Sequence, residues 1–255
     1  MQATPTHPAR SATELTALNR DFYDALWGKA RLVAPQRFNT WPLVRDLIAA
    51  AGARLEVAPG LRPRLPLQDT CFLDISVAAT RALRAQGCAA TVGLITDLPY
   101  ADAAFELVCA FDIVEHVDDD ETALAELARV AADGAALLLS VPLHASAWTA
   151  FDDFVGHRRR YEPADLRAKL ARHGFVVERS GVHGMQPASS RLLDLGMWFL
   201  THQRERAMWW YNRVIMPLGL RFQDRLDTSP GFIDDDGVDT VLLVCRRTAR
   251  ASSNG

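Results

Sequence analysis

Four acidic side chains follow four successive apolar runs of this 255-residue chain, close to the point where each run ends. They are Glu56, Asp74, Asp97 and Asp112. A single acid in such a place is often only a turn residue. Four in succession, together with a glycine turn at Gly60, indicate a polar rim, and a rim of carboxylates suits a ligand that carries positive charge.

The spacing of the first two acids points to a nucleoside. Asp74 lies 18 residues after Glu56, close to the offset of about 20 residues at which a carboxylate accepts a ribose hydroxyl. The phosphate-binding pattern GxGxxG is absent, and the segment 61–66, LRPRLP, is unsuited to form the helix that would hold a pyrophosphate. These features favour a nucleoside without phosphates over the dinucleotide of a nicotinamide-dependent oxidoreductase.

The elements that must position these acids are indicated by the apolar pattern. From residue 54 on, continuous apolar runs alternate with helical repeats, as in parallel strands that are covered on both faces. We expect strands at 54–58, 70–75, 90–95, 105–110, 135–141, 175–180 and 238–245. We expect helices at 13–28, 35–52, 76–86 and 118–132 and one opening at Pro163. This order predicts an α/β fold with a doubly wound, mostly parallel sheet of seven strands.

Local signals mark the ends of two of these helices. Ser76 can cap the helix at 76–86, and the acids at 118–120 suit the positive N-terminal end of the helix at 118–132. Gly134 is expected to end that second helix.

The chain divides into a core and its additions. We expect flexible ends at 1–12 and 249–255, N-terminal helices at 13–52, an α/β core at 53–183, a helical insert at 184–237 and a last core strand at 238–248. The insert holds three of the six tryptophans, among them Trp209, and is too apolar for a wholly exposed helix. It could pack on the sheet, cap the active site, pair two subunits as a homodimer or touch a membrane surface.

Composition excludes several classes of protein. The net charge of −3 and the pI of about 6.2 provide no overall basic field for nucleic acid. The four cysteines lack a CxxC pair and are predicted to be core thiols, so we expect no disulfide and no metal site. No apolar run approaches the roughly 18 residues of a membrane span, and the first residues lack the apolar core of a signal peptide. We therefore expect a soluble, cytoplasmic protein.

Five segments in order, LEVAPG, FLDIS, TDLP, FELVCAFDIVEHV and ALLLSVP, resemble the class I S-adenosylmethionine-dependent methyltransferases, specifically the type 11 methyltransferase-domain group. The resemblance covers residues 50–183. It implies the Rossmann-like fold of that family, with the last strand completing the sheet in an antiparallel hairpin at its edge. It also implies S-adenosyl-L-methionine as cofactor, S-adenosyl-L-homocysteine as product and a small-molecule acceptor.

The resemblance implies roles for single residues. In the family, the equivalent of Glu56 to Gly60 packs the methionine part of the cofactor, and the acid matching Asp74 binds the ribose hydroxyls. Asp97 and Leu98 match residues that hold the adenine. The cofactor-binding residues implied in this way are Glu56, Ala58, Gly60, Asp74, Ile75, Asp97, Leu98, Phe111 and Asp112. The N-terminal segment with Tyr23 and Trp27 would also lie over the pocket.

The glycine turn departs from the family pattern E/D-x-G-x-G-x-G. Ala58 and Arg62 stand in two of the glycine places. Either the loop is remodelled so that Arg62 faces the cofactor carboxylate, or the cofactor binds weakly. The departure leaves open a second hypothesis, a non-catalytic scaffold that binds a partner through the aromatic insert.

Methyl transfer from a sulfonium is an in-line displacement that needs no metal, so alignment and exclusion of water supply most of the rate. Oxygen and nitrogen acceptors often need a base, for which histidine is the usual candidate. The candidates are His116 in Glu-His-Val, His144 after the fifth strand and His157 in GHRRRY, a segment that resembles one frequent in relatives. Each could instead be structural, and His183 is expected to be so.

Three residues are candidates for acceptor binding: Arg159, Tyr161 and Trp209. The arginines at 158–160 could hold a carboxylate or phosphate of the substrate, because guanidinium binds such groups in bidentate fashion. Alternatively, ion pairs to neighbouring acids such as Asp152 tie this loop in place.

Overall fold

The computed structural model describes residues 20, 23–28, 30–183, 198–199, 202–233 and 237–249. The flexible end predicted at 1–12, most of that predicted at 249–255 and the first part of the insert, 184–197, lie outside these residues. Of the helix predicted at 13–28, residues 23–27 are described and are helical.

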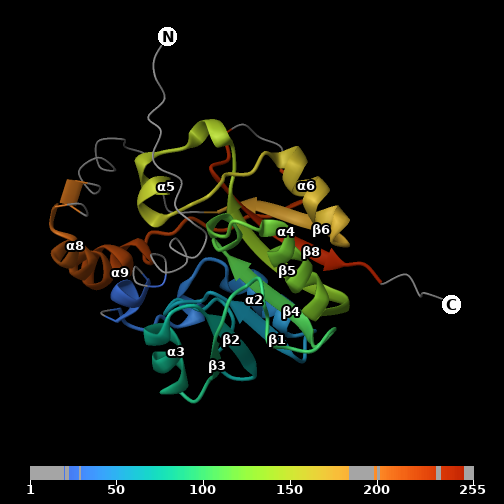
Figure 1. Ribbon diagram of the computed structural model, residues 1–255, viewed down its shortest axis with the longest axis horizontal. Helices are drawn as coiled ribbons and strands as arrows, with labels where there is room; N and C mark the ends of the chain where they lie inside the picture. Colours follow the sequence, from blue (N-terminus) through green and yellow to red (C-terminus); the bar gives the residue numbers. More distant parts are fainter. Residues whose placement is uncertain are drawn as a thin grey trace, which may run out of the picture.

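The centre of the molecule is one mixed sheet in the order β3-β2-β1-β4-β5-β8-β6-β7 (Figure 1). The strands are β1 Arg54–Val57, β2 Thr70–Asp74, β3 Ala89–Val92, β4 Phe105–Phe111, β5 Ala131–Pro142, β6 Phe175–Val182, β7 Ser229–Pro230 and β8 Thr240–Arg247. The first five pair in parallel, and β8 is antiparallel to both β5 and β6. The predicted doubly wound, mostly parallel fold is confirmed.

The sheet has eight strands where seven were predicted, because the short β7 pairs with β6. The last long strand, β8, lies inside the sheet between β5 and β6. The short β7 pairs with the other side of β6 and forms the edge of the sheet.

The helices follow the predicted order with shorter bounds. They are α2 Trp41–Ile48, α3 Val77–Arg84, α4 Asp120–Val130, α5 Ala150–Val155, α6 Pro163–Arg172, α8 Arg204–Trp210 and α9 Met216–Gly219. Short 3₁₀-helices are η1 Pro35–Arg37, η2 Val114–His116 and η3 Ala145–Ala147, and a π-helical turn, η4 Tyr211–Ile215, joins α8 to α9. The segment predicted as one helix at 35–52 is thus divided into η1 and α2.

Capping signals were correct at one helix and misplaced at another. Ser76 caps α3, since its side chain accepts a hydrogen bond from the backbone N–H of Ala79. Gly134 does not end α4, which stops at Val130 because Ala131 already pairs with β4. Gly134, with a φ of 75°, lies instead where the pairing of β5 with β4 shifts register.

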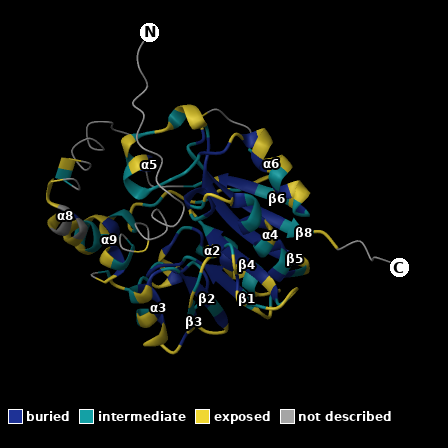
Figure 2. Cartoon of the chain, viewed as in Figure 1, coloured by how far each residue is buried: buried dark blue, intermediate teal, exposed yellow. Residues whose placement is uncertain are grey.

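Helices cover both faces of the sheet, and buried residues concentrate in its strands (Figure 2). On one face Val44 of α2 packs in the same buried cluster as Leu138 of β5. On the other face Leu127 of α4 and Leu170 of α6 pack with Leu137, the neighbouring residue of β5. All four cysteines are free thiols: Cys88, Cys109 and Cys245 are buried, whereas Cys71, which was predicted to lie in the core, is only half-buried. Among the described residues, no helix is both long enough and apolar enough to cross a membrane.

Replacing Leu138 by alanine tests this core, because its side chain is fully buried in the centre of the sheet. We expect Leu138→Ala to lower the free energy of unfolding by about 2–5 kcal/mol, the usual cost of such a cavity. Val77→Ala, at a position that is 42% exposed, serves as control and should change it by less than about 0.5 kcal/mol. Urea unfolding measures both, and equal losses would contradict the assigned core.

Candidate functional site

The turn after β1 adopts a backbone conformation that favours glycine. Ala58 and Gly60 have φ values of 57° and 55°, both in the left-handed region. The N–H of Ala58 donates to the carbonyl of Leu73 at 2.7 Å, which holds the turn against β2. A left-handed conformation costs a non-glycine residue roughly 1–2 kcal/mol. Ala58 therefore keeps the shape of the turn at the expense of local strain.

Asp74, at the end of β2, is fixed by the backbone of this turn. Its Oδ2 accepts a hydrogen bond from the N–H of Gly60 at 2.8 Å, and its Oδ1 accepts one from Ser76 at 2.8 Å. The side chain is buried, and burial raises its pKa to about 6 although the two N–H groups lower it. Ile75, which follows it, is half-buried. The structure thus presents Asp74 as an oriented carboxylate where the ends of β1 and β2 meet.

Glu56 takes a different place from the rim that was predicted. In the sheet it is level with Phe72 and Cys109, and it is buried. Its two carboxylate oxygens accept hydrogen bonds from the N–H groups of Arg64 and Leu65, at 2.8 and 2.9 Å. Burial raises the pKa of Glu56 to about 7. Glu56 therefore holds the loop after β1 from within, and its contact with a cofactor stays a prediction.

The remaining predicted cofactor residues lie after β3 and β4. Leu98 is buried and Asp97 is exposed, as expected for an apolar contact beside a polar one. Phe111 is half-buried at the end of β4. Asp112 is exposed, has a φ of 50°, and accepts a hydrogen bond from the hydroxyl of Ser140 at 2.7 Å. Their roles toward a cofactor stay predictions.

Two aromatic residues of the N-terminal segment cover this edge of the sheet. A Cβ atom added to Gly60 would lie only 2.2 Å from the indole of Trp27, so the glycine permits that close contact. The hydroxyl of Tyr23 lies 3.2 Å from Nε2 of His116. Burial raises the pKa of Tyr23, and the nearby carboxylates of Glu115 and Asp74 raise it further. Tyr23 therefore lies among the acids of the site.

Arg62, the second departure from the family's glycine pattern, joins three segments of the chain. Its guanidinium lies over the ring of Trp27 at 5.1 Å and over that of Tyr211 at 4.9 Å. It donates hydrogen bonds to the hydroxyl of Tyr211 and to Oδ1 of Asn212, each at 3.1 Å. Arg62 thus links the loop after β1 to η4 of the insert, and its contact with a cofactor carboxylate stays a prediction.

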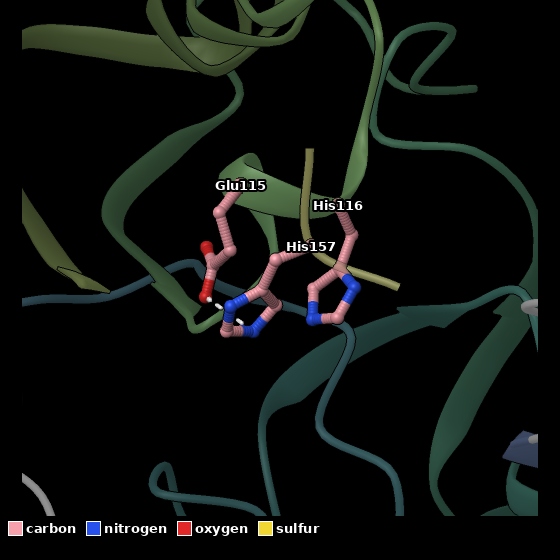
Figure 3. A group of neighbouring side chains, drawn as sticks. All are labelled: Glu115, His116 and His157. Atoms are coloured by element: carbon pink, nitrogen blue, oxygen red, sulfur yellow. Dashed lines mark ion pairs between the residues drawn. The ribbon is translucent and has the colours of Figure 1, made fainter. Parts of the chain in front are cut away.

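His116 of η2 and His157, which follows α5, lie side by side, with ring centroids 4.6 Å apart and nearly perpendicular planes (Figure 3). Burial, and secondly the neighbouring His157, lower the pKa of His116 to about 3. Burial also lowers the pKa of His157, although Asp152, 2.7 Å from its Nδ1, raises it. Both rings are therefore neutral at neutral pH, and His116 is a weak base.

Glu115 completes this group and was missed from the sequence. Its carboxylate is fully buried, and neither oxygen has a hydrogen-bond partner among the residues that the structure describes. Its Oε1 lies 3.8 Å from Nε2 of His157. Burial, and secondly Asp112, raise the pKa of Glu115 well above its usual range. Although Glu115 precedes His116 directly, only the fold brings His157 to it from 42 residues further on.

The other two histidines, His144 and His183, follow strands β5 and β6. His144, after β5, is half-buried and has a φ of 59°. Its N–H donates to the carbonyl of Tyr161, and its Nδ1 lies 3.7 Å from Glu162. His183, after β6, lies edge-on to Phe111 with centroids 5.4 Å apart, and burial lowers its pKa to about 4.

The arginine cluster is tied to acids of the chain itself. The ion pairs are Arg158 to Asp118 at 3.2 Å, Arg159 to Asp120 at 2.7 Å, and Arg160 to Asp152 at 2.9 Å and to Asp239 at 2.6 Å. Tyr161 is buried and donates its hydroxyl to Asp120 at 3.0 Å. This geometry supports the structural alternative for the loop. Acceptor binding by Arg159 and Tyr161 stays a prediction.

The described part of the insert exposes much of its apolar surface. Trp209 is 48% exposed, with its ring edge-on to Trp210 at 5.2 Å. Ile215, Leu218 and Phe222 are exposed as well. Tyr211, which follows Trp210, contacts the loop after β1 by accepting a hydrogen bond from Arg62. A contact of Trp209 with an acceptor stays a prediction.

Comparison with known proteins identifies the core. Residues 56–139 match the family model of the methyltransferase domain. The chain is 35% identical over 80 residues to ajmaline N-methyltransferase of Rauvolfia serpentina, which is 28% of each protein. It is 28% identical over 163 residues to a protein of Mycolicibacterium smegmatis named as an S-adenosylmethionine-dependent methyltransferase, covering 60% of this chain and 63% of the relative. The chain thus spans less than two thirds of these curated relatives.

Solved structures share the fold at low sequence identity. An S-adenosylmethionine-dependent methyltransferase from Thermotoga maritima superposes with a TM-score of 0.55 at 13% identity, covering 92% of this chain and 94% of the other. Phosphoethanolamine N-methyltransferase 2 of Haemonchus contortus, solved with S-adenosylhomocysteine, gives 0.54 at 14% identity, covering 95% and 62%. The resemblance noted in the sequence is confirmed.

The raised pKa of Asp74 predicts a pH-dependent stability. Its pKa of about 6 in the folded chain exceeds the value of 3.8 for an unperturbed group, so the stabilisation is complete below 3.8 and is lost as the pH rises through about 6. Relative to Asp74→Asn, the wild type should lose at most about 3 kcal/mol between pH 4 and 7. Urea unfolding of both at several pH values measures this, and parallel curves would refute it.

The Arg62 link predicts a local effect on the insert. Arg62→Ala removes two hydrogen bonds and two cation–π contacts, so hydrogen exchange in residues 209–215 should become about tenfold faster or more. The control is Arg45→Ala, which removes an ion pair exposed on α2. Mass spectrometry of exchanged peptides compares the two, and unchanged exchange in Arg62→Ala would rule out the link.

Proposed function

We propose that this chain, which belongs to the class I S-adenosylmethionine-dependent methyltransferases, transfers a methyl group from S-adenosyl-L-methionine to a small-molecule acceptor. One observation carries the proposal: within the matched domain, two backbone amides orient the buried carboxylate of Asp74 beside the left-handed turn that ends at Gly60. The relatives named above methylate small molecules according to their names, ajmaline and phosphoethanolamine.

The residues at this edge fit the cofactor. A carboxylate offers about four acceptor positions, so Asp74 retains capacity for ribose hydroxyls after binding two N–H groups. Gly60 allows close approach to the backbone, as its contact with Trp27 demonstrates. The exposed carboxylates of Asp97 and Asp112 suit a ligand with positive charge. When bound, the cofactor supplies an electrophilic methyl group on a sulfonium.

The chain's own residues align the reactants and exclude water. Tyr23 and Trp27 cover the edge of the sheet, and Arg62 fastens the insert to the same loop. In-line displacement depends mainly on such alignment. For an acceptor that must lose a proton, we assign the base to His144, which lies half-buried after β5.

Calorimetric titration with S-adenosyl-L-methionine and S-adenosyl-L-homocysteine tests the proposal. We expect micromolar binding by the wild type and at least about tenfold weaker binding by Asp74→Ala, because the oriented acceptor is lost. Asp46→Ala, at an exposed position of α2, is the matched control and should bind like the wild type. A folded wild-type protein that binds neither compound at millimolar concentration would overturn the proposal and favour a non-catalytic scaffold.

A further inference from the structure

A buried carboxyl group without a hydrogen-bond partner lies beside His116 and His157. Glu115 is fully buried at η2, and neither of its carboxylate oxygens has a hydrogen-bond partner within the described part of the chain. Burying a carboxylate in this way is costly unless it is paired, hydrogen-bonded or bound to a metal. The guanidinium of the nearby Arg160 is already paired with Asp152 and Asp239. Glu115 is therefore left with the contact to Nε2 of His157, at 3.8 Å, and with no hydrogen bond from the described residues.

Two imidazoles complete a cluster with metal-ligand chemistry. Glu115, His116 and His157 each offer one ligand atom, and these atoms all lie within 4.8 Å of one another. Figure 3 shows the carboxylate of Glu115 turned toward the ring of His157, with the ring of His116 beside it. Ligand atoms about 2.0–2.2 Å from a tetrahedral Zn²⁺ lie roughly 3.5 Å apart. A contraction of about an ångström, within the reach of side-chain rotation, would close the site on an ion.

The ring of His157 is oriented as metal-ligating histidines usually are. Its Nδ1 lies 2.7 Å from Oδ1 of Asp152, and its Nε2 faces Glu115. Asp152 is itself held by Arg160 and by Thr149, through the N–H and the hydroxyl of the latter. A carboxylate on the far nitrogen fixes both the tautomer and the direction of a ligating imidazole.

We propose that Glu115, His116 and His157 form a binding site for a divalent first-row transition cation such as Zn²⁺. Two imidazoles and one carboxylate are the ligand set of such ions rather than of Mg²⁺ or Ca²⁺, which prefer oxygen ligands alone. Three protein ligands leave one coordination position open for water or for an oxygen atom of a small molecule. The site stands on its own contacts, whether or not the chain transfers methyl groups.

Calorimetry of the metal-free, full-length chain with Zn²⁺ tests this site, and absorption of the Co²⁺-loaded protein reports its coordination. We expect one ion per chain in the wild type. Glu115→Gln and His157→Gln should each weaken binding about a hundredfold or more, and Asp152→Asn should weaken it about 10–100-fold as a positioning residue. The matched control is His173→Gln, whose histidine pairs with Glu121 at 2.7 Å outside the cluster. It should bind like the wild type.

Thermal unfolding separates ligand loss from misfolding. Without metal, Glu115→Gln should melt at or above the wild-type temperature, because the amide of glutamine needs no counter-charge in the protein interior. Added Zn²⁺ should raise the melting temperature of the wild type and of His173→Gln by a few degrees and leave Glu115→Gln unchanged. The proposal is overturned if the folded wild type binds no Zn²⁺ or Co²⁺ at 0.1 mM free metal. It is equally overturned if Glu115→Gln and His157→Gln bind as tightly as the control.

Discussion

The hydrogen bonds from the backbone to the buried carboxylate of Asp74 organise the site. A buried carboxylate must be satisfied locally, and here one oxygen binds the turn after β1 while the other binds the start of α3. This pair of contacts fixes the end of β1 relative to β2. Both left-handed residues of this turn bind β2: the N–H of Gly60 donates to the acid, and the N–H of Ala58 donates to the carbonyl of Leu73. Trp27 can approach the turn only because residue 60 lacks a side chain.

The long side chain at position 62 gives the same loop a second function. Besides the pairing of β7 with β6, the Arg62 guanidinium supplies a further polar link between the core and the insert: it binds Tyr211 and Asn212 and lies over the rings of Trp27 and Tyr211. Cation–π contacts gain strength when they are shielded from water. Arg62 therefore joins the N-terminal segment, the loop after β1 and η4. A substitution that displaces one of these three segments should therefore also change the positions of the other two.

The charged groups around His157 differ in how well they are paired: the arginines at 158–160 all have acidic partners, whereas Glu115 lacks hydrogen bonds from the described residues. The arginines of the loop before α6 are all compensated by acids, so that region is held rigidly and presents little free positive charge. Glu115 has only the longer contact to Nε2 of His157, at 3.8 Å, and within the described part of the chain neither of its oxygens accepts a hydrogen bond. A buried polar group without a hydrogen-bond partner requires an explanation, such as a catalytic role or a bound water or ion. The contrast between the two neighbouring groups is what singles out the cluster with His116.

The sequence by itself determined the alternation of strands and helices in the core, the cap at Ser76 and the family of the core, because these depend on local periodicity and short motifs, whereas α5 and the short β7 were not predicted. Tertiary structure alone decided that Glu56 turns inward, that β8 lies between β5 and β6, and that Arg62 meets a residue 149 positions away. It also decided that His157 meets Glu115. Such contacts depend on how strands stack and loops cross over them. The hydrophobic period, two residues in a strand and 3.6 in a helix, indicates on which face of the element a side chain lies. It does not indicate which residue from a distant part of the chain contacts that side chain.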